Sequence, residues 1–300
     1  MSGVPHRIFP ILLITGSACG PASPVEWRRV EGGPDTSCGM GDPYHFFAKT
    51  SSEEKLFVFL GGGGACWDGV SCDVERTARF SSEPDTIRPY QRGLLNDAHE
   101  LNPFRDHSFL IIPYCTGDLN LGTRVDEYER PEPGDLPAGF EVHDFGLRLV
   151  PAALSGRVDK VPDPEIVVVG GQSGGAPASP LVASLLARHY PDARVVQVGD
   201  AAGALQIPRL TWRLLQQWGA DSLLLAEGLI DESDAAEMTL EDLYLGASRL
   251  APDLQLSQIN SVDDPTQEMF LALLGLEDVP VSQVLFRSMI RLESAVPGFR

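Results

Sequence analysis

The chain has 300 residues, 43% of them hydrophobic, and it carries 42 acidic against 23 basic residues for a net charge of −19. This length and apolar content suffice for one large α/β domain with a substantial core. A negative field of this size repels nucleic acid and anionic membrane surfaces, so we expect neither as a partner.

The first 24 residues have the pattern of an export signal. A short basic start precedes an apolar run at residues 8–14, and small residues follow as far as Cys19. The run is too short to span a bilayer, and the whole pattern is typical of a secretory signal peptide. Small residues directly before Cys19 also resemble a bacterial lipoprotein signal, in which that cysteine is acylated. We therefore predict an extracytoplasmic protein, with lipid anchoring and free secretion both left open.

The rest of the chain, residues 25–300, is predicted to be a single domain in which strands alternate with helices. We expect strands at residues 44–49, 55–60, 108–114, 166–170, 193–199 and 254–259, and helices at 139–154, 181–189, 207–218, 234–250, 268–276 and 282–291. The first two strands flank a polar turn and are typical of a hairpin. Strands that alternate with helices favour an α/β fold with a mainly parallel sheet and helices on both faces. Two polar, proline-containing segments, 68–106 and 119–138, are expected to border the substrate pocket.

Four consecutive glycines, Gly61 to Gly64, follow the predicted strand at 55–60. Glycines in such a run are hard to justify by packing, because each has more conformational entropy to lose on folding. Their physical use is to leave backbone N–H groups free to point at an anion or an oxyanion. A floppy loop is the alternative interpretation, and Cys66 and Trp67, which anchor its end, argue against that alternative.

The stretch at residues 166–175 predicts a reactive serine. Its apolar strand runs directly into Gly171-Gln172-Ser173-Gly174-Gly175, and an apolar helix follows at 181–189. This strand, turn and helix form the context that a G-x-S-x-G nucleophile elbow requires. Glycines at both ends of the pattern let the strand and the helix approach without a Cβ clash. A glycine-rich turn without any catalytic role remains the alternative for this pattern alone.

Apart from Cys19, the chain has four cysteines, Cys38, Cys66, Cys72 and Cys115. An even number in an oxidising compartment favours two disulfides, for which three connectivities exist. Cys66 and Cys72 are close enough in sequence to close a small loop, and Cys38 and Cys115 are then the remaining pair. No cysteine or histidine pair has zinc-finger spacing, so we expect no metal site.

Several motifs occur in an order that resembles the pectinacetylesterase family. They are the glycine-rich segment ending in Ala65-Cys66, the later Cys72, the IPYCTGD segment at 112–118 and the serine elbow. The resemblance covers roughly residues 36–275. It implies a variant α/β-hydrolase that cleaves carboxylic esters with a Ser-Asp-His triad and needs no cofactor or metal.

The resemblance also assigns roles to individual residues. Ser173 corresponds to the nucleophile, and the amides of Gly63 and Gly174 correspond to the oxyanion-hole donors. Asp264, in a D-x-x-Q pattern, corresponds to the triad acid, with its neighbour Asp263 as the residue that could be confused with it.

The chain departs from the family pattern at three places. Gly174 stands where the family usually has alanine, and Asp200-Ala-Ala-Gly replaces an Asp-Ser-Gly segment. Gly64 stands where some members carry an aromatic side chain that lines the pocket. We expect Gly64 and Trp67 to border the substrate pocket of this chain, and these departures leave its shape open.

The triad base is absent from its expected place. The fold orders its triad Ser, Asp, His, but no histidine follows Asp264. We therefore expect the sequence to stop short of the family's histidine, as a C-terminally incomplete domain. Among the internal histidines, His143 is the best substitute, because the helix that we predict it to open starts on the active-site side. His45 and His107 open strands and are expected at the opposite edge of a parallel sheet, and His189 at the far end of the helix after Ser173.

The sequence as a whole predicts a secreted or lipid-anchored serine carboxylesterase. We expect a monomer that hydrolyses a small-molecule or glycan-linked acyl ester, with an acetyl or longer acyl group. Two other classes stay open: a catalytically inactive, surface-displayed ligand-binding protein, and a serine peptidase on the same scaffold.

Overall fold

The computed structural model describes residues 26–73, 77–81, 90–130, 138–155, 161–203 and 205–300. The predicted signal peptide at 1–24, with Cys19, lies outside these residues. In the described ranges no helix is both long and apolar enough to cross a membrane.

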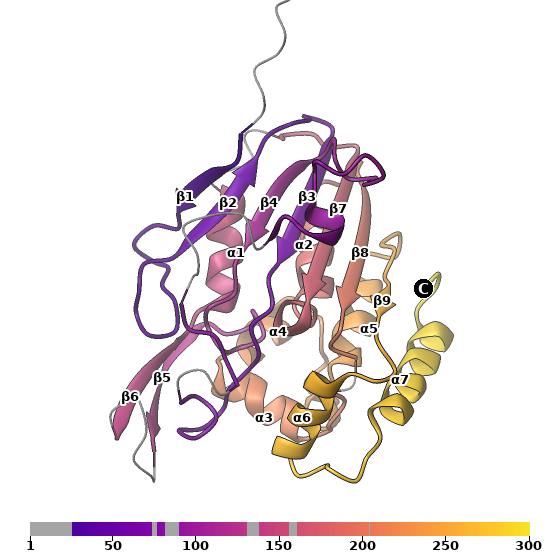
Figure 1. The fold of residues 1–300 in the computed structure, drawn as a ribbon. Coiled ribbons are helices and arrows are strands. Elements are labelled where there is room, and N and C mark those ends of the chain that lie inside the picture. Colours follow the sequence, from indigo (N-terminus) through magenta and orange to yellow (C-terminus); the bar gives the residue numbers. More distant parts are fainter. Residues whose placement is uncertain (1–25, 74–76, 82–89, 131–137, 156–160, 204) are drawn as a thin grey trace, which may run out of the picture.

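A seven-stranded sheet forms the centre of the molecule (Figure 1). Its strands follow the order β1-β2-β4-β3-β7-β8-β9. Their bounds are β1 Arg28–Glu31, β2 His45–Lys49, β3 Lys55–Leu60, β4 Ser108–Ile112, β7 Ile166–Gln172, β8 Arg194–Asp200 and β9 Gln258–Ile259. The strands from β4 to β9 run parallel, whereas β1 and β2 are antiparallel at one edge. The mainly parallel sheet confirms the predicted α/β class.

The helices follow the strands along the chain, as α/β topology requires. They are α1 Gly146–Ser155, α2 Ser179–His189, α3 Leu210–Gln217, α4 Asp221–Ala226, α5 Glu241–Leu250, α6 Pro265–Leu273 and α7 Val281–Ala295. Short 3-10 helices are η2 Gly93–Leu95, η4 Ser173–Gly175 and η5 Ala235–Glu237.

Both faces of the sheet are buried, which explains the almost continuous apolar strands. On one face, Val167 and Val169 of β7 join the large core under α1 and α2. On the other face, Val168 packs with aromatic residues such as Phe57 and Phe109 under the loop that contains η2 (Figure 1).

The predicted hairpin between residues 44–49 and 55–60 is wrong. Strand β4 lies between β2 and β3, antiparallel to the first and parallel to the second. All five residues of β4 are buried, so its backbone needs hydrogen-bond partners along both edges. The Ser108 hydroxyl also accepts hydrogen bonds from the amides of Ser51 and Ser52, each at 3.0 Å, which fixes the turn against β4.

The predicted helix at 139–154 begins only at Gly146. Residues Gly139–Asp144 instead form strand β6, which pairs antiparallel with β5 (Arg124–Glu129) in a separate two-stranded sheet. Along β6, Val142 and Asp144 are buried while their neighbours are more exposed, and this alternation is typical of a half-buried strand. The segment predicted as a long loop at 119–138 therefore contains a strand.

The disulfide connectivity that the spacing favours is confirmed. Cys38 pairs with Cys115, 77 residues apart, and Cys66 pairs with Cys72, 6 residues apart. Two disulfides are consistent with a protein that folds in an extracytoplasmic compartment.

Candidate active site

Ser173 lies on a sharp turn between β7 and α2. Its φ of 48° is in the left-handed region, and the 3-10 helix η4 begins at this residue. A residue with a Cβ adopts this conformation at a cost of about 1–2 kcal/mol. Such strain persists only where the surrounding structure enforces it, and it is common at functional sites. The strand, turn and helix predicted around Ser173 are thus present, with its side chain half-buried.

Glycines around Ser173 are required by close backbone contacts. A Cβ on Gly171 would collide with the Gly175 carbonyl oxygen, and a Cβ on Gly175 would collide with the carbonyl oxygens of Leu60 and Gly61. The elbow therefore packs directly on the end of β3. This contact explains why two glycines flank the serine at this spacing.

The glycine-rich segment after β3 lies against the elbow. A Cβ on Gly62 would lie 2.8 Å from the Ser173 Cβ, and a Cβ on Gly174 would lie 3.5 Å from the Gly63 nitrogen. The Gly63 amide donates to no acceptor among the described residues. The structure therefore brings Ser173, Gly63 and Gly174 together, with a free N–H group beside the serine.

The two residues expected at the substrate pocket have different surroundings. Gly64 has a φ of 85°, and a Cβ there would collide with the Thr77 carbonyl oxygen, so the backbone leaves no room for an aromatic side chain. Trp67 lies in the wall of an apolar pocket and contacts Phe270 of α6, with ring centroids 6.5 Å apart.

The first residue along the chain that lines this pocket is Ala65, two residues after Gly63. Its wall includes Ala65 and Trp67 from the glycine-rich segment, Trp218 after α3, and Phe270 and Leu274 from the region of α6. Every residue in the wall has an apolar side chain except for one threonine. Such a lining suits a hydrocarbon group and offers few partners to sugars or charged groups.

Asp264 caps the N-terminus of α6. One carboxylate oxygen accepts hydrogen bonds from the amides of Thr266 and Gln267 at 3.0 and 3.1 Å, and the other accepts from the Gln267 side chain at 3.0 Å. The D-x-x-Q pattern thus orients the carboxylate. Its neighbour Asp263 is exposed.

A second carboxylate, Asp200, lies near this acid. It ends β8 directly opposite Gln172, the residue before Ser173. Burial, and then the charge of Asp264, raise the pKa of Asp200. The sequence departs from a family pattern at Asp200, and its place at the end of a parallel strand beside the elbow is a signal that could have predicted it as part of the site.

Within the described residues, no histidine forms a hydrogen bond with Ser173. The predicted substitute, His143, lies in β6 rather than at a helix start, and its Nδ1 is 2.7 Å from the Ser37 hydroxyl. The predicted place of His45, at the opposite edge of the sheet, is also wrong. Strand β2 runs antiparallel to β4, so His45 at the start of β2 lies toward the edge where β4 ends. There it contacts Arg29, at 3.3 Å.

The remaining described histidines lie elsewhere, and the exposed His99 accepts a hydrogen bond from the Leu101 amide at 3.2 Å. His107 is buried before β4 against Phe104, and burial lowers its pKa. His189 ends α2 and packs edge-on against Tyr190. These positions leave the serine without an imidazole partner in the described part of the chain.

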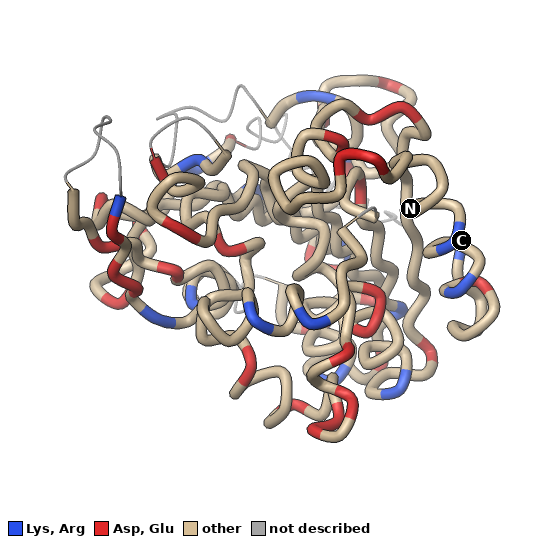
Figure 2. The backbone as a smooth tube through the Cα atoms, turned by 90° about the horizontal axis from the view of Figure 1, so that it is seen from below, with Lys and Arg blue, Asp and Glu red and all other residues tan. Residues whose placement is uncertain are grey.

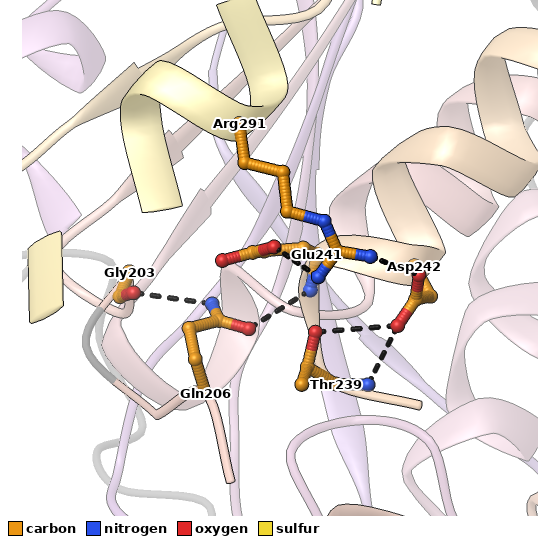
Figure 3. Close-up of polar contacts among 6 residues, drawn as sticks. All are labelled: Gly203, Gln206, Thr239, Glu241, Asp242 and Arg291. Atoms are coloured by element: carbon orange, nitrogen blue, oxygen red, sulfur yellow. Dashed lines mark hydrogen bonds and ion pairs between the residues drawn. The ribbon is translucent and has the colours of Figure 1, made fainter. Parts of the chain in front are cut away.

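The segment after β8 is fixed by a polar network (Figure 3). Arg291 of α7 binds Glu241 at 2.6 Å and Asp242 at 3.1 Å. The Glu241 amide donates to the Gln206 side chain, which in turn donates to the Gly203 carbonyl oxygen at 3.1 Å. The network therefore connects the C-terminal helix to residues that line a second, smaller pocket.

Acidic residues outnumber basic ones along the chain, which has a net charge of −19. Figure 2 looks at the molecule from the side toward which β3, β7 and β8 run, and red positions outnumber blue ones along the backbone. A negative net charge of this size disfavours polyanionic substrates.

Comparison with known proteins gives one partial similarity. Over 82 residues the chain is 32% identical to palmitoleoyl-protein carboxylesterase NOTUM of Schmidtea mediterranea, a match that spans 26% of this chain and 16% of that protein. No model of a known protein family matches the chain. A quarter of the chain is thus similar to part of a carboxylesterase, in agreement with the resemblance drawn from its motifs.

Proposed function

We propose that this protein is a serine carboxylesterase with Ser173 as its nucleophile. The observation that carries the proposal is the left-handed Ser173 at the end of β7, in contact with Gly62 and beside the free amide of Gly63. The partial similarity to a carboxylesterase supports the same reaction class.

In the proposed reaction, the Ser173 hydroxyl attacks the ester carbonyl carbon and loses its proton to a base. The amides of Gly63 and Gly174 stabilise the negative charge that develops on the carbonyl oxygen. The tetrahedral intermediate collapses, the C–O bond to the alcohol breaks, and the alcohol leaves with a proton. Water then attacks the acyl-serine in the same way and releases the carboxylic acid.

We propose that the base is an imidazole that the described residues of this chain do not supply. The support is that Asp264 is held in one orientation by Gln267, while no described histidine forms a hydrogen bond with Ser173. An imidazole placed between Asp264 and Ser173 would complete the triad.

The substrate class follows from the pocket and the charge. The apolar wall formed by Trp67, Trp218 and Phe270 favours an acyl group with a hydrocarbon chain, and the negative net charge disfavours polyanionic carriers. The two disulfides support action in an extracytoplasmic compartment, either free or lipid-anchored through Cys19.

The proposal is tested by trapping the acyl-enzyme. The chain is incubated with p-nitrophenyl esters from acetate to octanoate, and the peptides are mapped by mass spectrometry. p-Nitrophenolate leaves without being protonated, so acylation depends less on the base than the attack of water on the acyl-serine does. We therefore expect the acyl adduct to accumulate on the Ser173 peptide, and longer acyl groups to react faster. Ser173→Ala should abolish the adduct, whereas Ser184→Ala, at a buried serine in α2, should leave it unchanged. An adduct that persists in Ser173→Ala would contradict the proposal.

The second candidate is a ligand-binding protein that keeps the pocket but not the reaction. It is favoured by the absence of a hydrogen bond between a histidine and Ser173 in the described residues. Saturable binding of a fatty acid without any adduct from the matching ester would support this alternative.

A further inference from the structure

Asn120 lies between the two backbone segments that form the proposed oxyanion hole. Its side-chain amide donates to the Gly61 carbonyl oxygen at 3.3 Å and to the Gly174 carbonyl oxygen at 3.4 Å. Gly61 belongs to the glycine-rich segment and Gly174 to the elbow. The last ladder pair between β3 and β7 is Leu60 opposite Gly171, so Asn120 spans the segments just beyond the end of the ladder.

The position of Asn120 is rigidly fixed. Its side chain is fully buried, and its φ of 59° is left-handed, a conformation that asparagine adopts more readily than most residues. The preceding Leu119 is also left-handed, with a φ of 58°, at a cost that neighbouring contacts must offset. The amide of Leu119 donates to the Tyr114 hydroxyl at 3.0 Å.

Asp118 holds this strained loop in place. Its buried carboxylate accepts hydrogen bonds from the Thr116 hydroxyl at 2.6 Å and from the amides of Asn120, Gly122 and Gly146 at 3.0, 3.1 and 2.7 Å. The bond to Gly146 ties the loop to the start of α1. Asn120 is therefore presented to the two segments by a scaffold that does not itself touch Ser173.

We propose that Asn120 is a positioning residue for ester hydrolysis, which clamps the glycine-rich segment to the serine elbow so that the amides of Gly63 and Gly174 converge on one oxygen. This proposal rests on the carboxylesterase function proposed above. Oxyanion stabilisation depends on donors that are already in place before reaction, so a loosened clamp slows the chemical step without weakening substrate binding.

Two variants and one matched control test the clamp. Asn120→Gly keeps the left-handed backbone and removes the side chain, because glycine adopts a positive φ freely. Asn120→Asp keeps the shape but replaces the donor with an oxygen. The control is Asn102→Asp: Asn102 is another buried asparagine whose amide bridges two carbonyl oxygens, those of Leu94 and Asn96, on the other face of the sheet.

The first readout is hydrogen–deuterium exchange of the peptides that contain residues 61–65 and 172–176. Both Asn120 variants should exchange about 10-fold faster in both segments, and Asn102→Asp should not. The second readout is phosphonylation of Ser173 by a fluorophosphonate with imidazole added as base. We expect the maximal rate to fall about 10-fold while the half-saturating probe concentration stays unchanged.

Each contrary result counts against a different claim: the clamp, its role in the reaction, or the proposed function. Unchanged exchange in both segments would overturn the clamp. Faster exchange with an unchanged phosphonylation rate would overturn its role in the reaction. A wild-type chain that is never phosphonylated, although Asn120 protects both segments, would leave the clamp standing and remove the proposed function instead.

Discussion

The two halves of the candidate site are held by different means. Around Ser173, backbone packs on backbone so closely that a methyl group at Gly171 or Gly175 would collide with a carbonyl oxygen. Around Asp264, a single helix N-terminus orients the carboxylate through its own amides and Gln267. Next to this second half an apolar residue is exposed: Val262, two residues before Asp264, is 64% exposed.

Because of this difference, we expect substitutions in the two halves to affect the stability of the fold and the rate of the reaction differently. A change in the backbone half should disturb the fold and the proposed oxyanion hole together, because the same contacts serve both. A change at Asp264 should disturb proton transfer while the fold remains nearly as stable.

The largest effect is expected from the disulfide that spans the backbone half. Removing Cys38–Cys115, with its 77-residue separation, should cost about 4.5 kcal/mol of unfolding free energy, and removing Cys66–Cys72, with a separation of 6, about 2 kcal/mol. The reason is that a longer loop gains more entropy when the unfolded chain is released. Urea unfolding of the two double-alanine variants measures both losses. Equal losses would contradict this account of the disulfides.

A single methyl group added to the elbow should also lower the unfolding free energy. Gly175→Ala forces a Cβ into the carbonyl oxygens at the end of β3, and we expect a loss of about 3 kcal/mol. Gly139→Ala is the matched control, because no described residue other than its chain neighbours lies within 4 Å of a Cβ at that position. Thermal unfolding should show a change of less than about 0.5 kcal/mol for the control. Equal stability of the two variants would show that the elbow relaxes freely.

The buried Asp144, beside the Asp118 scaffold, should make stability depend on pH. Burial, and then Asp118 and Asp126, raise the pKa of Asp144 to about 10, and neither of its carboxylate oxygens has a hydrogen-bond partner in the described residues. An aspartate in the unfolded chain titrates near pH 4, so between about pH 4 and pH 10 the folded state holds a proton that the unfolded state has lost. The contribution of Asp144 to the unfolding free energy is therefore largest below about pH 4 and falls as pH rises, by up to about 1.4 kcal/mol per pH unit.

Asp144→Asn removes this contribution. Urea unfolding at pH 4, 6 and 8 should show that the variant gains stability relative to the wild type as pH rises. Parallel profiles for the two proteins would contradict a protonated Asp144.

The smallest effect on stability is expected at Asp264. Asp264→Asn can still cap α6 and should change the unfolding free energy by less than about 0.5 kcal/mol, whereas Asp264→Ala should cost about 1 kcal/mol. Both variants should lose imidazole-assisted release of p-nitrophenol, because neither side chain is charged. A fully active Asp264→Asn would show that Asp264 does not act as the triad acid.

The sequence predicted the features that depend on local pattern. The apolar strand before Ser173, the glycines around it and the short cysteine loop are set by neighbouring residues, and all are present in the structure. The order of β2, β4 and β3 was not predicted, because strand pairing depends on contacts far apart in sequence. Strand β6 was predicted as a helix because the apolar spacing of residues 139–154 fits both periods over a short window.

The candidate site was predictable only in part. Ser173, Gly63 and Gly174 follow from motifs, and the structure places them together. Asn120 carries no motif of its own, and its proximity to the elbow arises from the path of the chain after β4. Asp200 could have been inferred from its place at the end of a strand, opposite Gln172.

The central claim is that the described residues hold the proposed nucleophile and its oxyanion donors but no base for them. The most direct test is the rate at which a fluorophosphonate labels Ser173 as imidazole is titrated into the reaction. We predict slow labelling without imidazole, and a rate that rises with imidazole concentration and is absent in Ser173→Ala. Rapid labelling that does not depend on imidazole would contradict the account, because the described residues would then have to supply the base themselves.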